Sequence, residues 1–194
     1  MTHPTRRPTN RFGRVRLAAA LVLVAVLPAA CGGGQAGPIR SPYEVRFSPN
    51  GEPMNGGPRG YPPCDEALGR WFANADLNHD GRLRRDEYLA DARRQFAIMD
   101  LDRNGEVTPA ELGQYRAPYA TPPANVDTRM MGPTIRATFP DPVMSADTGL
   151  RFRVGLDAFL ASGARRFADL SGGPDGTLTR AVVGRLCEEQ ESDD

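Results

Sequence analysis

The chain has 194 residues, enough for one domain of ordinary size, and its 24 lysine and arginine residues balance 24 acidic residues. A neutral total excludes a polybasic nucleic-acid binder. Every basic residue is an arginine, which excludes lysine-based catalysis by a Schiff base or a P-loop. Only two histidines are present, so few arrangements of a histidine-centred catalytic triad are open. Composition therefore favours a non-enzymatic protein.

Residues 1–30 carry five arginines and no acidic residue, and they include the uninterrupted apolar run 17–27. The run is shorter than the roughly 20 residues that span a membrane, so residues 1–30 are predicted to be a signal peptide. Small residues precede Cys31, and this junction resembles a bacterial lipobox. The resemblance implies cleavage before Cys31, lipidation of its thiol and a protein anchored in the cell envelope. Pro28 stands where the lipobox usually has an aliphatic residue, which leaves an ordinary secretory signal as the alternative.

Glycine and proline make up almost half of residues 31–63. Such a composition disfavours a long helix or a central strand, so this segment is predicted to be a tether between the anchor and the domain. Residues 43–47 alternate in polarity like a short strand, which leaves open that this part docks on the domain.

Two segments of twelve residues, 76–87 and 100–111, share one pattern of oxygen-bearing side chains. Positions 1, 3 and 5 are Asp or Asn, position 6 is Gly, position 8 is apolar and position 12 is Glu. Calcium takes six to eight oxygen ligands, and such a loop supplies them from side chains, from the carbonyl of position 7 and from both oxygens of the Glu. We therefore predict two calcium ions, held by Asp76, Asn78, Asp80, Arg82 and Glu87 in the first loop and by Asp100, Asp102, Asn104, Glu106 and Glu111 in the second.

Apolar residues at helical spacing flank both loops and predict helices there. Only twelve residues separate Glu87 from Asp100, which is room for one helix. That helix must leave the first loop and enter the second, so the loops lie at its two ends, roughly 20 Å apart. Each loop therefore needs a different loop as its partner.

The C-terminal third supplies two candidate partners when the sequence is aligned with itself at an offset of 71 residues. Segments 147–158 and 171–182 keep the apolar positions of the two calcium loops but lose most of their ligands. Ala158 and Val182 stand where the intact loops have their closing Glu, so neither segment is expected to bind calcium in the usual way. Residues 117–142, between the two halves, combine six prolines with several apolar residues and are predicted to be a strap lying on the domain.

These motifs resemble the EF-hand superfamily, in particular small exported bacterial EF-hand proteins. The resemblance implies an all-α domain over residues 64–190 with two intact and two degenerate helix-loop-helix repeats. It also implies a calcium-binding, non-enzymatic envelope protein in which the ions are structural or buffering. The alternatives are a calcium-stabilised adaptor for an envelope protein partner and a calcium sensor. Gly32 after the lipidated cysteine favours the outer membrane, if the cell has one.

With Cys31 assigned to the lipid, Cys64 and Cys187 remain as an even pair in an oxidising compartment. A disulfide is the expected state of such a pair. The alternative is two separate buried thiols, because free cysteine packs as a small apolar residue.

Overall fold

The computed structural model describes residues 43–124 and 141–192. The predicted signal peptide, Cys31 and residues 125–140 of the predicted strap lie outside this part of the chain. None of the helices formed by these described residues is long and apolar enough to cross a membrane.

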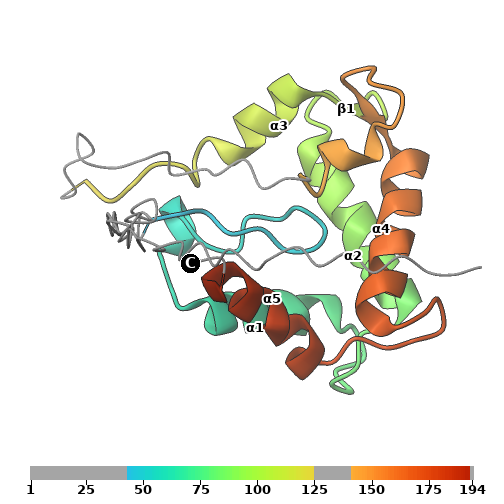
Figure 1. The fold of residues 1–194 in the computed structure, drawn as a ribbon. Helices are drawn as coiled ribbons and strands as arrows, with labels where there is room; N and C mark the ends of the chain where they lie inside the picture. The colour runs from blue at the N-terminus through green and yellow to red at the C-terminus, as the bar shows by residue number, and fades with distance from the viewer. Residues whose placement is uncertain (1–42, 125–140, 193–194) are drawn as a thin grey trace, which may run out of the picture. The chain divides into compact units, whose positions relative to one another are not determined.

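The described chain is mostly helical, with one sheet of two short antiparallel strands (Figure 1). In chain order the elements are η1 (Gly57–Arg59), α1 (Cys64–Ala75), α2 (Arg85–Met99), β1 (Glu106–Val107), α3 (Pro109–Arg116), η3 (Met144–Ala146), β2 (Val154–Gly155), α4 (Leu156–Ser171) and α5 (Arg180–Ser192). The loop 76–87 thus lies between α1 and α2, and the loop 100–111 leads from α2 into α3.

The helix ends follow from local chemistry. Asp65 and Glu66 lie in the first turn of α1, where negative charge interacts favourably with the helix dipole. Thr108 caps α3, because its hydroxyl oxygen accepts a hydrogen bond from the Glu111 amide at 3.3 Å. Pro109 occupies the first turn of α3, where its missing N–H costs nothing.

Short backbone pairings join the N-terminal and C-terminal halves of the chain. Val107 in β1 lies opposite Val154 in β2, and Leu83 forms an isolated antiparallel bridge with Leu178. All four side chains are fully buried. The loop 76–87 is therefore joined to segment 171–182, and the loop 100–111 to segment 147–158.

Helix packing follows from these pairings. Helix α2 connects the two N-terminal loops, α4 connects the two C-terminal segments, and these two helices pack against each other. Because their ends are paired crosswise, α2 and α4 run in opposite directions, while α1 packs against α5. Buried side chains form one apolar cluster near the Leu83–Leu178 bridge, including Trp71, Tyr88 and Phe167, and a second near β1 and β2, including Phe96, Met99 and Phe159.

The predicted tether differs from the structure in its second half. Residues 43–63 pack on the domain, with a bridge between Phe47 and Pro53 and with Val45 and Met54 only 3% and 5% exposed. Gly56 has a φ of 93° and lies so close to the backbone carbonyl of Tyr119 that a side chain would collide with it. Here glycine permits close packing of the backbone, and it does not mark a free linker.

A buried carboxylate fastens this segment to the helices. Asp91 of α2 accepts hydrogen bonds from Asn50 Nδ2 at 2.9 Å and from Trp71 Nε1 at 3.0 Å, and it pairs with Arg94. Glu52 pairs with Arg94 at 3.6 Å as well. The buried carboxylate of Asp91 thus has two donors and a cation as partners, as a buried ionised group requires.

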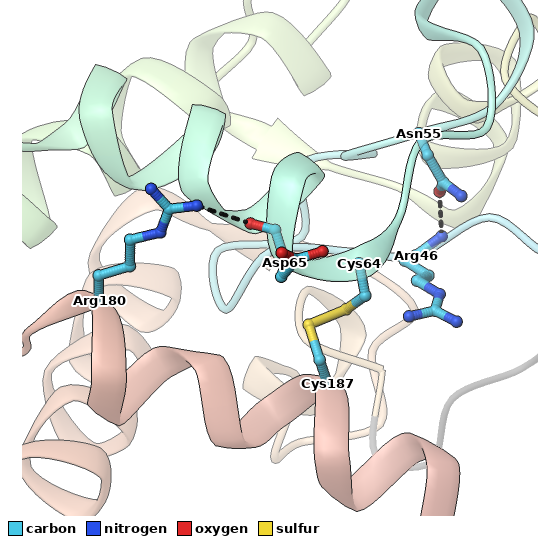
Figure 2. Close-up of a disulfide and its surroundings, with 6 residues drawn as sticks. All are labelled: Arg46, Asn55, Cys64, Asp65, Arg180 and Cys187. Atoms are coloured by element: carbon cyan, nitrogen blue, oxygen red, sulfur yellow. Dashed lines mark hydrogen bonds between the residues drawn. A yellow bond between two sulfur atoms is a disulfide. The ribbon is translucent and has the colours of Figure 1, made fainter.

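In the structure the first and last helices are linked covalently. Cys64 and Cys187 form a disulfide with a Cα–Cα distance of 5.8 Å, within the usual range for such bonds (Figure 2). Nearby, the guanidinium group of Arg180 in α5 donates to the backbone carbonyl of Asp65 in α1 at 3.4 Å. The bond therefore joins the helix that enters the loop 76–87 to the helix that follows segment 171–182.

Candidate metal centre

The side chains of the loop 76–87 turn inward on the loop's own backbone. Asp76 Oδ2 accepts from the Gly81 amide at 2.8 Å, and Asn78 Oδ1 accepts from the Asp80 amide at 3.0 Å. Glu87, in the first turn of α2, accepts from the Asn78 amide at 3.3 Å and from the Arg84 amide at 3.0 Å. The closing carboxylate is thereby held over the beginning of the loop.

The loop 100–111 is organised in the same way. The two carboxylate oxygens of Asp100 accept from the amides of Asn104 and Gly105 at 3.0 and 2.9 Å. Glu111 accepts from the amides of Leu101 at 3.1 Å and Thr108 at 2.9 Å. Asp100, Asp102 and Glu111 each offer a carboxylate oxygen, and these atoms all lie within 4.8 Å of one another. Three acidic groups from twelve residues of chain thus converge on one small volume.

Backbone conformation is shared as well. Gly81 and Gly105, at position 6 of the two loops, have φ values of 75° and 84°. Position 4, occupied by His79 and Arg103, is also left-handed, with φ values of 56° and 61°. Glycine is favoured at position 6 of this turn, because left-handed backbone disfavours side chains.

One buried oxygen indicates what the first loop is built to hold. Asp76 is only 4% exposed, and its Oδ1 atom is buried without a hydrogen-bond donor. An acceptor in that position is costly unless a donor or a cation faces it. Hard oxygen donors of this kind suit calcium, and the residues of both loops fit the ion that the sequence predicts.

Electrostatics distinguish the two loops. Asp80 forms an ion pair with Arg84 at 2.8 Å; desolvation raises the pKa of Asp80, but hydrogen bonding and charge from Arg84 lower it by more. The backbone and side-chain hydrogen bonds of Thr108 lower the pKa of Glu111. Both carboxyl groups are therefore ionised at neutral pH, but a ligand of the first loop is already paired with a cation.

Segment 147–158 keeps the backbone of the two acidic loops but, of the side chains at positions 1, 3, 5 and 12, only the acid at position 1. Asp147 accepts from the amides of Arg151 at 3.0 Å and Phe152 at 2.6 Å, as Asp100 does in the loop 100–111. Leu150 and Phe152, at positions 4 and 6, have φ values of 51° and 56°. The backbone hydrogen bond from Arg151 is the largest influence that lowers the pKa of Asp147. The turn is thus preserved although Phe152 replaces the glycine.

Segment 171–182 departs further from this geometry. Helix α4 runs to Ser171 and ends at Gly172, which is left-handed with a φ of 80°. The Ser171 hydroxyl donates to the Gly173 carbonyl at 2.7 Å, and position 1 carries no carboxylate. What remains is the buried Leu178 and its bridge to Leu83.

The structure brings the predicted ligands Asp100, Asp102 and Glu111 together, and in the loop 76–87 it places Asp76, Asn78 and Glu87 on amides of the loop's own backbone. Nothing in the sequence indicated the buried Asn50, Glu52 and Asp91, or the half-exposed Arg94 that pairs with both acids. The left-handed Phe152 was also missed, although its place at position 6 of a turn that favours glycine was a signal that could have identified it.

Comparison with known proteins matches two segments of the chain to the EF hand family, residues 68–90 and residues 93–114. Each match contains one of the two acidic loops. No curated protein and no solved structure matches the chain.

Proposed function

Since the chain is a member of the EF-hand superfamily, we propose that it is a non-enzymatic protein that binds two calcium ions, one in each of the loops 76–87 and 100–111. The observation that carries the proposal is the inward-facing carboxylate at position 1. In the first loop one oxygen of Asp76 is buried without a donor, and in the second loop Asp100 lies within reach of two other carboxylates. Both arrangements are matched by a hard cation with six to eight oxygen ligands.

Calorimetric titration of the chelated protein with calcium tests this proposal. We compare the wild type with Glu87→Gln and Glu111→Gln, each of which removes one bidentate ligand. Glu66→Gln is the matched control, because Glu66 is exposed in α1 and outside both loops. Two ions should bind to the wild type and to the control. Each loop variant should bind one ion in its unaltered loop, and the altered loop should bind calcium with much reduced affinity. Absence of heat, together with an unchanged melting temperature on adding calcium, would refute calcium binding.

We further propose that calcium is structural or buffering. A sensor EF-hand pair exposes an apolar groove when the ion binds. In this chain residues 43–56 contribute to the packing of the helices: Met54 belongs to the apolar cluster that includes Trp71, and Asn50 donates to the Tyr88 carbonyl and to Asp91. Calcium at a hundredfold excess over its Kd would stabilise such a domain by about 2.7 kcal/mol.

A dye that binds exposed apolar surface separates these two roles. A structural role predicts that calcium raises the melting temperature while the fluorescence of the dye stays constant or falls. A sensor role predicts increased dye fluorescence on adding calcium to the folded protein. The control is Glu111→Gln, in which any calcium response of the second loop is weakened.

The segments 147–158 and 171–182 are proposed to be degenerate EF-hand loops. Support comes from the bridges Val107–Val154 and Leu83–Leu178, which join position 8 of each intact loop to position 8 of a degenerate one. The left-handed residues of segment 147–158 add to this support. Calcium stoichiometry tests the assignment, because a third ion would contradict it.

We propose export and lipid anchoring through Cys31. This rests on the sequence of residues 1–32, with its arginines, apolar run and small residues before the cysteine. Mass spectrometry of the mature N-terminus, with Cys31→Ala as the comparison, tests it. A mature chain that begins elsewhere and carries no lipid would exclude the anchor.

A further inference from the structure

Two large apolar side chains project into solvent from the turn between η3 and β2. Leu150 is 80% exposed and Phe152 is 73% exposed. Arg151 and Arg153 alternate with them and are also exposed. The turn is the orange loop beside β1 in Figure 1. Exposure of a phenylalanine to this degree has no use in packing the domain.

The backbone holds these side chains outward at a conformational cost. Both Leu150 and Phe152 are left-handed, which side chains disfavour, and Phe152 occupies the position filled by glycine in the two acidic loops. The carboxylate of Asp147 stabilises the turn through the amides of Arg151 and Phe152. Unfavourable backbone that is held in place by the surrounding structure is characteristic of functional surfaces.

The number and spacing of these residues indicate the occupant. Each partner of a stable protein complex buries about 800 Å², far more than a turn with two apolar side chains offers. An anionic membrane requires only shallow insertion of apolar groups with arginines at the level of the headgroups. Arg151 and Arg153 supply the positive charge for lipid headgroups. Arg153 pairs with Glu106 at 3.2 Å, but both side chains are about half exposed, so a lipid phosphate can compete with Glu106 for it.

We propose that the turn 149–153 is a membrane-contacting surface that inserts Leu150 and Phe152 into the interface of an anionic lipid bilayer, with Arg151 and Arg153 on the lipid phosphates. The inference is independent of calcium binding and of the lipid on Cys31. It assigns a second contact with the membrane, through the domain itself.

Tryptophan substitution reports the contact at the residue concerned. Phe152→Trp is mixed with phosphatidylglycerol vesicles that carry bromine in their acyl chains, at one fixed calcium concentration. Leu77→Trp is the matched control, because Leu77 is an apolar residue that is 64% exposed and lies in the loop 76–87, outside the turn 149–153. Trp71 is only 3% exposed and contributes the same background to both proteins. Circular dichroism and melting temperature establish that both variants are folded.

We expect quenching at position 152 to exceed quenching at position 77 by about threefold or more. Replacing phosphatidylglycerol by phosphatidylcholine, or adding Arg151→Glu and Arg153→Glu to the Phe152→Trp chain, should reduce that quenching to the level of the control. Equal quenching at positions 152 and 77 would overturn the proposal, because binding through the apolar run 17–27 is common to both chains. Concentration-dependent dimerisation that shields position 152 without lipid would also overturn it, in favour of a contact between copies.

Discussion

The disulfide between Cys64 and Cys187 provides the sharpest test of how the two halves are held together. The perturbation is reduction of the bond, paired with the double variant Cys64→Ala and Cys187→Ala. In either case α1 and α5 keep their noncovalent contacts, such as the Arg180 hydrogen bond to the carbonyl of Asp65. The difference in unfolding free energy therefore reports the covalent link.

The expected magnitude follows from the sequence separation of 123 residues. Closing a loop of that length in the unfolded chain lowers its entropy by an amount worth about 5 kcal/mol at 25 °C, and measured losses for native disulfides are about 2–5 kcal/mol. The alanine variant also removes two sulfur atoms from sites that are 9% and 8% exposed. The double variant should consequently be slightly less stable than the reduced wild type. The reduced wild type is therefore the better reference for the effect of the covalent bond.

Urea unfolding at saturating calcium measures the effect through Trp71, which is the only tryptophan in the chain and is 3% exposed. Oxidised wild type, reduced wild type, the double variant and Cys31→Ala are compared. We expect Cys31→Ala to match the oxidised wild type, and the other two to lose about 2–5 kcal/mol. A loss below about 1 kcal/mol on reduction would refute the reasoning, because the entropy model cannot give so little for so long a loop.

Three further outcomes are expected. The loop 100–111 carries a net charge of −3 and the loop 76–87 a net charge of −1, so Glu111→Gln should remove the tighter of two calorimetric phases; loss of that phase in Glu87→Gln would reverse the ranking. Burial raises the pKa of Asp141, but Arg116 and the backbone amides of Met144 and Val143 together lower it below the ordinary value for an aspartate. Its contribution to stability is therefore present above the pKa of the unfolded chain and is lost as pH falls through the lower pKa of the folded chain, so Asp141→Asn should lose less unfolding free energy than the wild type as pH falls from about 5 to about 3; equal losses would contradict the assignment. Asp91→Ala should cost about 3–5 kcal/mol in urea unfolding, because Arg94 and two other donors lose their buried partner; a loss under 1 kcal/mol would show that they find other partners.

The acidic loops and their helices could be predicted because their determinants are local. A ligand at every second position, a glycine at position 6 and a Glu at position 12 fix the turn within twelve residues. The length of α2, fifteen residues, then sets the loops about 22 Å apart and excludes their pairing with each other. Because the two acidic loops cannot pair with each other, Leu83 of the first loop pairs with Leu178 of the C-terminal half.

Residues 43–63 could not be placed from composition, because what holds them is distant in sequence. Asn50 finds its acceptor Asp91 41 residues away, and Arg116 lies over the ring of Phe47. Glycine and proline counts describe local backbone preference, and they contain no information about such tertiary partners. Phe152 presents the opposite case: a local preference for glycine is overridden by the hydrogen bonds that Asp147 makes to the turn.

The segments 147–158 and 171–182 have a physical role that does not require calcium. Backbone groups at position 8 of an EF-hand loop need a partner strand, because a buried N–H or carbonyl without one is costly. Leu83 and Leu178 exchange two backbone hydrogen bonds, at 2.8 and 3.0 Å, and each side chain is fully buried. An apolar residue at Val154 and Leu178 is therefore needed whether or not these segments carry ligands, since both side chains complete the cores beside the loops 76–87 and 100–111.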